Sequence, residues 1–262
     1  MTRHDFGQIS AGSKPVPYWE PTREWDGETC FILCGGPSAA AHDIGRLRGH
    51  KLIAVNSSIF TAPWANFLLF GDTRWWDEYE RDAELKRILQ NDALRVVSCS
   101  SIVRHPRVLR MKRLEQGGIS HDKAFLKIKY TSTISAQNLA AHLGAKKIVT
   151  IGLDGKNGGA DGNQTHHHLA RPHPWKQKPH SFAKQRKEFM AAAAELKKLG
   201  IEAVNASPGS ALADIFPIVD FDAAVDEDCR RLAENRSRAQ VQDDNVTTAS
   251  RQCHEQPQQQ AG

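Results

Sequence analysis

The sequence predicts an α/β fold in which helices cover both faces of a mostly parallel sheet. Short apolar runs recur along the chain, and segments with helical spacing lie between them. The runs are continuous rather than alternating, as expected for strands that are buried on both faces. The expected strands are residues 30–34, 52–55, 67–70, 95–99, 125–128, 148–151 and 201–204. Together these observations predict a single-domain, Rossmann-like three-layer sandwich.

Helical spacing of apolar residues marks three longer segments, at about 75–90, 132–143 and 182–199. The third is the clearest, because its apolar residues share one face, Ser181 can cap its start and Gly200 can end it. In sheets of this kind ligands bind beyond the carboxyl ends of the strands. The residues that follow each strand are therefore the candidates for a functional site.

The chain of 262 residues divides by composition into three parts. Residues 1–28 show no periodicity and are expected to form an irregular arm that packs on the body through Tyr18, Trp19 and Trp25. Residues 29–225 form the predicted nucleotide-binding domain. The remaining segment, 226–262, is polar and nearly free of large apolar residues, so we expect a short helix followed by a disordered tail.

Composition also narrows the class of protein. No apolar stretch is long enough to span a bilayer, and the amino-terminal residues have no apolar leader core, so a cytoplasmic protein is expected. The five cysteines are scattered without a CxxC pair, which favours reduced thiols and no structural zinc. The net charge of +5 favours an anionic partner, either a nucleotide or, through the basic segments 104–113 and 171–187, a nucleic acid.

The first strand exit reads Gly35-Gly36-Pro37-Ser38 and leads into an alanine-rich segment. Glycines allow a ligand to approach the backbone closely, and Pro37 suits the first position of a helix. We therefore expect the amides of Ser38 and Ala39 to face a phosphate at a helix amino terminus, the alternative being an ordinary tight turn. The segment matches neither the GxGxxG fingerprint nor a Walker loop, which argues against NAD chemistry and P-loop hydrolysis.

Two further exits carry polar side chains. Asn56 follows the second strand, and its carboxamide can donate to and accept from a base or a ribose, although such an Asn is often only a turn residue. The third strand leads into Asp72-Thr-Arg74-Trp75-Trp76. The alternatives there are a simple ion pair and core tryptophans. We interpret the cluster as part of a substrate pocket, with Asp72 as a catalytic candidate.

Hydroxyl groups and a carboxylate follow the later strands. Four hydroxyls in five positions, among them Thr131, Ser132 and Ser135, exceed what one helix cap needs, so a second helix terminus facing the ligand is expected. Asp154 follows the next strand and is a second catalytic candidate. The residues expected at the last exit to line the substrate pocket are Asn205 and Ser207.

The segment between Asp154 and the last long helix is rich in glycine, histidine and basic residues. A long loop at this edge of a sheet is usually functional. Three consecutive histidines, His166, His167 and His168, do not share a helix face, and no carboxylate lies at a familiar ligand spacing. One of them is therefore expected to act as a general base or to contact phosphate, and no metal site is expected.

Taken as a set, these motifs resemble a branch of the MptE-like (6-hydroxymethylpterin diphosphokinase-like) Rossmann family found in tailed phages and prophages. The resemblance covers about residues 29–217. It is carried by Gly-Gly-Pro-Ser, the Asn exit, Gly-Asp, Leu-Gly-Ala-Lys-Lys-Ile, Gly-Leu-Asp and Asn-Ala-Ser-Pro-Gly-Ser. It implies the fold and a phage or prophage context, but it does not specify one reaction.

The same outline is similar to bacterial sialyltransferases of the Campylobacter type, which hold CMP with a Gly-Pro-Ser loop and an Asn on the next strand and use a histidine as base. The likeness implies that one of residues 166–168 is that base. The residues it implies for the nucleotide are Gly35, Gly36, Pro37, Ser38 and Asn56, with Ser132 beside them. The tryptophan-containing third exit and the histidine cluster depart from the sialyltransferase pattern.

Three functional hypotheses follow. The leading one is a nucleotide-dependent transferase, most readily a glycosyltransferase with a nucleotide or nucleotide-sugar as substrate. The second is diphosphate transfer from ATP to a pterin-like alcohol, which requires magnesium and makes Asp72 and Asp154 its ligands. The third is a phage protein that binds nucleotide or nucleic acid without catalysis. No membrane partner is expected, and the sequence does not specify the oligomeric state.

Overall fold

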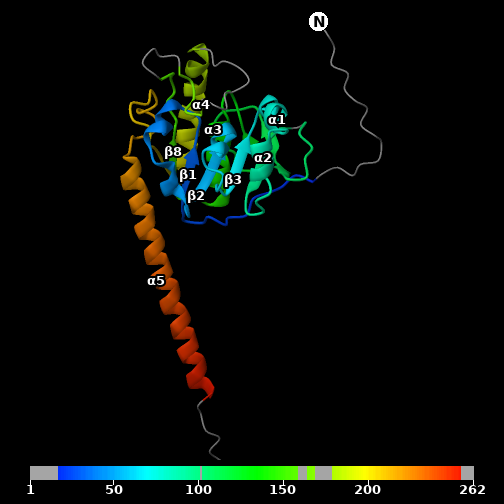
Figure 1. The fold of residues 1–262 in the computed structure, drawn as a ribbon. Coiled ribbons are helices and arrows are strands. Elements are labelled where there is room, and N and C mark those ends of the chain that lie inside the picture. The colour runs from blue at the N-terminus through cyan, green and yellow to red at the C-terminus, as the bar shows by residue number, and fades with distance from the viewer. Residues whose placement is uncertain (1–16, 101, 159–163, 169–178, 255–262) are drawn as a thin grey trace, which may run out of the picture.

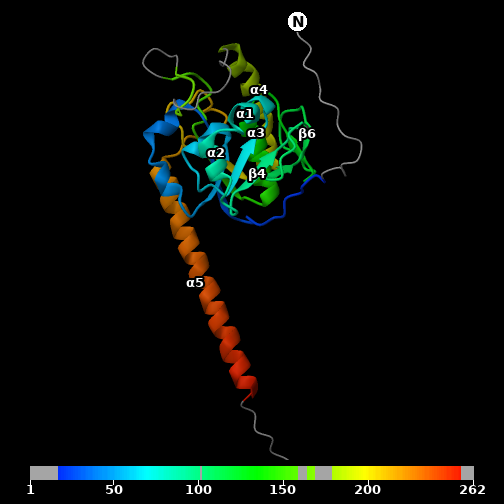
Figure 2. The same cartoon turned by 45° about the vertical axis from the view of Figure 1, so that its right-hand side comes forward.

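The computed structural model describes residues 17–100, 102–158, 164–168 and 179–254. Residues 1–16 of the expected arm, part of the basic segment 171–187 and residues 255–262 lie outside this description. The described chain forms a seven-stranded, entirely parallel sheet with helices on both faces, as Figures 1 and 2 show. The predicted α/β three-layer fold is thereby confirmed.

The strand order across this sheet is β5-β4-β3-β2-β1-β8-β9. The chain therefore builds outward from β1 in one direction and then returns to the other side of β1 with β8. The strands of the sheet are β1 (Thr29–Leu33), β2 (Lys51–Val55), β3 (Phe67–Phe70), β4 (Arg95–Ser98), β5 (Val108–Arg110), β8 (Lys147–Ile151) and β9 (Glu202–Asn205). The gap between the carboxyl ends of β1 and β8 is the topological switch point, where such sheets bind ligands.

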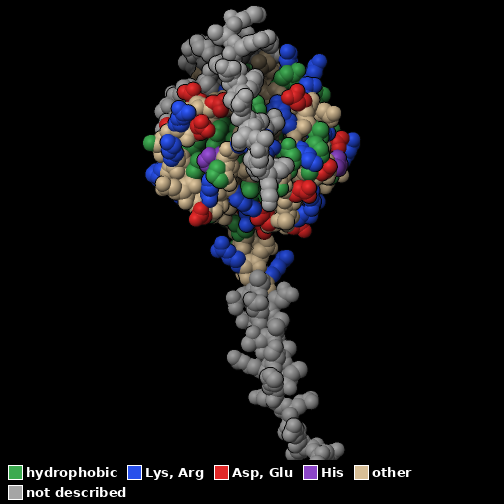
Figure 3. Space-filling model, turned by 90° about the vertical axis from the view of Figure 1, so that its right-hand side faces the viewer, with side chains coloured by type: hydrophobic (Ala, Val, Ile, Leu, Met, Phe, Trp, Pro, Cys, Tyr) green, Lys and Arg blue, Asp and Glu red, His purple; other side chains and the backbone are tan. Residues whose placement is uncertain are grey.

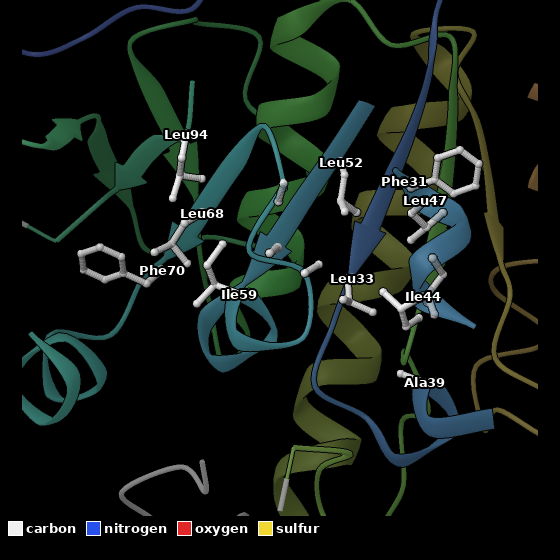
Figure 4. Close-up of a cluster of buried hydrophobic side chains, with 14 of the residues drawn as sticks. Phe31, Leu33, Ala39, Ile44, Leu47, Leu52, Ile59, Leu68, Phe70 and Leu94 are labelled. Carbon is white, nitrogen blue, oxygen red and sulfur yellow. The ribbon is translucent and has the colours of Figure 1, made fainter. Parts of the chain in front are cut away.

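Both faces of the sheet are buried, which explains the continuous apolar runs. Along β1, Phe31 and Leu33 face one hydrophobic cluster, and Cys30 and Ile32 face the other. Figure 4 shows side chains of the first cluster gathered between the sheet and the short helices. These helices are η1 (Pro37–Ala41), η2 (Ile44–Leu47), η3 (Asn56–Phe60), α1 (Thr73–Tyr79) and α2 (Ala83–Ile88). The second face is covered by α3 (Ser132–Leu143) and α4 (Pro179–Lys198).

One expected strand lies in a different place. Residues 125–128 do not enter the main sheet, because β7 (Phe125–Lys127) pairs with β6 (Lys112–Leu114) in a separate two-stranded sheet. The edge position is taken by β5, which pairs with β4. β5 is only three residues long and ends in an arginine, so its apolar pattern is too short to be recognised from the sequence.

The helix expected over 75–90 is two helices. α1 ends near Glu80, and Asp82 caps the start of α2 by accepting hydrogen bonds from the amides of Glu84 and Leu85. An Asp that bonds the following amides favours a new helix start over continuation. The helix expected over 132–143 is confirmed as α3.

The segments at the two ends of the chain pack on the sheet. In the arm, Trp25 is buried against Phe67, with ring centroids 5.2 Å apart, whereas Tyr18 stays exposed. At the other end α5 (Phe221–His254) is one helix of 34 residues, which projects from the body in Figure 1. The boundary expected between residues 225 and 226 therefore falls inside this helix rather than at its end.

The first turns of α5 are held by charge as well as by apolar contact. His50, just before β2, lies 2.6 Å from Asp228, and both side chains are almost fully buried. Burial alone raises the pKa of the Asp228 carboxyl, but hydrogen bonds from His50 and Arg231 outweigh it, so that this pKa lies below its ordinary value. This buried hydrogen bond anchors α5 at the amino-terminal edge of the sheet, opposite the strand exits.

Within the described residues, no helix is both long enough and apolar enough to cross a bilayer.

The anchor gives a prediction about stability. Replacing Asp228 with Asn should lower the free energy of unfolding by about 2 kcal/mol at neutral pH, because a buried charge-assisted hydrogen bond is lost. Since the pKa of Asp228 is lowered by folding, its contribution is present above the unfolded pKa and disappears as the pH falls through the folded one. Urea unfolding of wild type and variant across acid pH should show the two curves converging.

The matched control is Asp222→Asn on the same helix, which removes an exposed ion pair with Arg46 and should change stability little. If both variants lost the same stability, the buried pair would not be the anchor.

Candidate functional site

A cavity of about 470 Å³ opens at the carboxyl ends of the central strands. Its walls come from the exits of β1, β2, β3 and β8, from the start of α3 and from the histidine segment. Of the residues predicted from the sequence, those that line it are Gly35, Gly36, Asn56, Asp72, Arg74, Thr131, Ser132, Asp154 and His166. Residues far apart in the sequence thus meet at one rim, at the topological switch point.

Two glycines allow the segments that follow β1 and β8 to lie in direct backbone contact. The amide of Gly36 donates to the carbonyl oxygen of Gly152 (2.9 Å). A Cβ atom on Gly36 would lie 2.0 Å from Oδ2 of Asp154 and 2.4 Å from the Gly152 oxygen. Gly152 has φ +71°, and its own Cβ would lie 2.6 Å from the Cys34 oxygen. Neither position therefore accommodates a side chain without backbone movement.

The segment after Gly36 differs from the expected phosphate-binding helix start. Pro37–Ala41 is a five-residue 3₁₀ helix, not an α-helix. The Ser38 amide points to Oδ2 of Asp154 (3.3 Å), and the Ala39 amide donates to the Gly36 oxygen (3.2 Å). Pro37 and Ser38 lie outside the cavity lining. The two glycines form the cavity wall, whereas Ser38 contributes by contacting Asp154.

Asp154 is a buried carboxylate in the cavity wall. The residue is only 8% exposed, and burial raises the pKa of its carboxyl, partly offset by hydrogen bonding from Ser38. Two residues expected in the substrate pocket instead support its backbone: Ser207 Oγ accepts from the Leu153 amide (2.8 Å), and Asn205 Nδ2 donates to the Leu153 oxygen (3.0 Å). Both are fully buried and lie outside the cavity lining, where they hold the β8 exit in place.

Asn56 has a strained backbone and an unused acceptor. Its φ is +52°, in the left-handed region that few non-glycine residues adopt. Its Oδ1 atom is buried and has no hydrogen-bond partner, although the residue lines the cavity. Strain and an unsatisfied polar atom at one residue of a cavity wall are typical of a ligand-binding position.

The β3 exit separates into a polar rim and a core. Asp72 caps α1 by accepting from the Arg74 amide (2.9 Å), and the Arg74 guanidinium donates to both of its carboxylate oxygens. Trp75 and Trp76 are buried, and Trp75 donates to Ser57 (2.8 Å). The tryptophans therefore belong to the core and not to the substrate pocket, because helix α1 turns its indoles toward the sheet.

The amino terminus of α3 faces the cavity. Thr131 caps it by accepting from the Thr133 amide (3.2 Å), and residues 131–133 all line the cavity. Ser135 is buried and donates to the Lys127 oxygen (2.9 Å), so it is structural. The neighbouring thiol of Cys34 contacts Thr133 (3.3 Å), and burial raises its pKa to about 12. This cysteine is therefore protonated at neutral pH.

The three histidines have different surroundings. His166 lines the cavity, and its Nδ1 lies 2.8 Å from the Thr165 hydroxyl. The His167 amide donates to the Gly35 oxygen (2.9 Å), and burial lowers the pKa of its imidazole, partly offset by contacts to residues 35 and 36. His168 is buried and stacks on His166, with ring centroids 5.1 Å apart. Only His166 among the three reaches the cavity.

Several lining residues are absent from the sequence prediction. Arg113 comes from β6, an unrecognised strand, and Lys156 follows Asp154 by two positions. Tyr130 has φ +63°, is 52% exposed, and its carbonyl accepts from Gln185 of α4 (3.1 Å). Lys156 and Tyr130 lie at strand exits and were accessible to the same reasoning. Arg113 and Gln185 were not, because only the tertiary packing brings β6 and α4 to this rim.

The carboxylates of the cavity fit a magnesium ion poorly. Both oxygens of Asp72 accept from Arg74, and Asp154 is turned toward the Ser38 amide. Among the described residues, no group of three or more His, Cys, Asp or Glu side chains could hold a metal ion.

Comparisons with known proteins give no family assignment. No family model matches the sequence. A search of curated proteins finds no match either.

Among solved structures, matches are found to sialyltransferases. A crystal structure of the sialyltransferase CST-II in complex with a trisaccharide acceptor and CMP has 15% sequence identity and a TM-score of 0.44, covering 73% of this chain and 86% of that chain. CstII from Campylobacter jejuni in complex with the substrate analogue CMP-3FNeuAc has 14% identity and a TM-score of 0.43, with the same coverage. Monomeric CstII has 16% identity and a TM-score of 0.42 over 73% of this chain and 86% of that one.

The contact between Gly36 and Gly152 gives a prediction about the stability of the protein. Gly36→Ala should lower the free energy of unfolding by about 2–3 kcal/mol, because the new methyl group must displace Asp154 and the Gly152 backbone. Urea unfolding with an unchanged slope would measure the loss.

Gly45→Ala is the matched control for this prediction. Its Cβ would meet only the side chain of Asp43, at 2.9 Å, which can move aside. Equal stability of the two variants would show that the contact between Gly36 and Gly152 is not sterically constrained.

Proposed function

We propose that this chain binds a nucleotide in the cavity at the switch point and transfers a group from it, as a nucleotide-dependent glycosyltransferase. The observation that carries the proposal is Asn56, which lines the cavity, has a buried Oδ1 without a partner and has a backbone in the left-handed region. A base or ribose offers the donor that this oxygen lacks. The strain is consistent with a conformation kept for binding rather than for stability.

The phosphate of such a ligand has a suitable place beside Asn56. The α3 amino terminus presents Ser132 and Thr133 together with the positive end of the helix dipole. Lys156 contributes positive charge to the same cavity, whose other lining cations, Arg74 and Arg113, are paired with Asp72 and Glu115. A leaving nucleotide develops negative charge on its phosphate, which these groups stabilise.

His166 is proposed as the general base. In transfer, an acceptor hydroxyl gives its proton to the imidazole as its oxygen attacks the anomeric carbon, and the bond from that carbon to the phosphate oxygen breaks. The nucleotide leaves with the bonding electron pair. Asp154, with its raised pKa and partial enclosure, lies on the same wall and orients the acceptor.

On the strength of its motifs, we also propose that the chain belongs to the MptE-like group of phage and prophage proteins. Diphosphate transfer is less well supported, because Arg74 already occupies both oxygens of one of the two carboxylates required.

Nucleic-acid binding finds little support in the described part of the chain. In the basic segment 104–113, Arg107 pairs with Asp92 (2.8 Å), Arg113 pairs with Glu115 (3.2 Å), and Arg110 is buried. Figure 3 shows positive and negative side chains interspersed on the face that it displays. Phosphate backbones are bound by charges that are free to face them, so a small nucleotide is the better-supported ligand.

Asn56→Gly tests the nucleotide site without disturbing the fold. Glycine adopts the same φ freely, so the melting temperature should stay close to that of wild type, while affinity should fall about tenfold through the lost hydrogen bond. Calorimetric titration with CMP, UMP, AMP and GMP would measure both the preferred base and the loss.

Asn91→Ala is the control for this titration, since Asn91 closes an exposed turn outside the cavity. If no nucleotide bound wild type, or if Asn56→Gly bound as tightly, the proposed nucleotide site would be wrong.

His166→Gln tests the assigned base. Removing a general base should slow turnover about 10²–10⁴-fold while leaving nucleotide affinity nearly unchanged. Release of nucleotide from a panel of nucleotide-sugars, with water or a sugar acceptor, would be followed by chromatography.

His42→Gln, a histidine held by the Ala206 carbonyl away from the cavity, is the matched control. Full activity of His166→Gln would remove His166 from the mechanism while leaving nucleotide binding in place.

A further inference from the structure

The edge of the sheet opposite the cavity carries a second cluster of reactive groups. Sγ of Cys229 lies 3.6 Å from Nε2 of His50, and Nδ1 of the same imidazole lies 2.6 Å from Oδ2 of Asp228. Cys229 and Asp228 are on α5, whereas His50 precedes β2. The thiol thus contacts the imidazole, and the imidazole contacts the carboxylate that orients it. A nucleophile is generally activated by this arrangement of a base and an orienting group.

We propose that Cys229 is a thiol-modification site at which small disulfide compounds form a mixed disulfide. The inference is independent of the proposed transferase activity, because the cluster shares no residue with the cavity.

Exposure distinguishes this thiol from the others described. Cys229 is exposed, whereas Cys30, Cys34 and Cys99 are buried. Burial raises the pKa of Cys34 to about 12 and that of Cys99 to about 11. Thiolates rather than thiols are nucleophilic, so the buried cysteines are inert at neutral pH. Cys229 alone among these combines access to solvent with an adjacent base.

The imidazole is held in one orientation. His50 and Asp228 side chains are 4% and 2% exposed, and the ring packs edge-on against Phe31 at 5.3 Å between centroids. With Nδ1–H donating to the carboxylate, Nε2 presents its lone pair to the thiol. Arg231 also donates to Asp228 (2.7 Å), which keeps that carboxylate ionised and in place.

The chemistry balances without a cofactor. The Cys229 proton moves to Nε2 of His50, and the thiolate attacks one sulfur of the disulfide reagent. A new sulfur–sulfur bond forms as the old one breaks, and the second sulfur leaves as a thiolate with the bonding electrons. His50 then returns the proton to the leaving thiolate or to solvent. The protein thiol is oxidised, and the reagent is reduced.

Reaction with dithiodipyridine, a neutral disulfide, tests the proposal on the full chain. All variants would carry Cys253→Ser, so that the measured release of thiopyridone from α5 comes from a single thiol. The reference is Cys229→Ser combined with Ala233→Cys, which places a thiol on an exposed position one turn further along the helix. Release of thiopyridone at neutral pH should be about tenfold faster from Cys229 than from this reference.

His50→Gln should bring the rate at Cys229 down to that of the reference, with circular dichroism confirming the fold. His42→Gln should leave it fast. If His50→Gln unfolds, the comparison between the rates of Cys229 and the reference thiol in folded chains still tests the proposal. Equal rates at the two positions, or a fast reaction in folded His50→Gln, would overturn the proposal and leave the cluster as a structural anchor alone.

Discussion

The close backbone contact between the segments that follow β1 and β8 is the constraint on which the site depends. Gly36 and Gly152 lie in backbone contact there, and each lacks room for a Cβ atom. The contact lies at the topological switch point of the sheet, and both glycines line the cavity. Asp154 follows Gly152 by two residues and lines the same cavity. A single steric requirement thus connects the topology of the sheet with the position of its buried carboxylate.

Several polar groups around the cavity have partners inside the protein, whereas Oδ1 of Asn56 and Oδ1 of Asn205 are buried without one, and of these two residues only Asn56 lines the cavity. Asp72 is satisfied by Arg74, Thr131 by a helix amide, and Ser207 by the β8 exit. Buried polar atoms without partners are costly, so native structures keep few of them. The unsatisfied Oδ1 of Asn56, at a strained backbone position beside the cavity, is consistent with a group reserved for a ligand.

The two edges of the sheet have separate roles. The carboxyl-terminal edge carries the cavity, whereas the amino-terminal edge carries the buried pair of His50 and Asp228 that holds α5. Coupling of the long helix to the body depends on a few groups at its start, since Phe221 and Val225 are its main buried apolar side chains there.

The sequence by itself determined the layer architecture and the rim on which the site lies. Continuous apolar runs specify strands buried on both faces, and parallel strands bring their exits to one edge, so Asn56, Asp72 and Asp154 could be placed together in advance. Ser132 lines the same cavity although the strand expected before it lies in a separate two-stranded sheet. The roles within that rim were decided by tertiary structure. Whether Trp75 packs in the core, Asn205 supports a loop or His166 reaches the cavity depends on side-chain direction and on contacts between distant segments. Local pattern carries no information about those contacts, and short strands such as β5 and β6 owe their existence to pairing with neighbours rather than to their own composition.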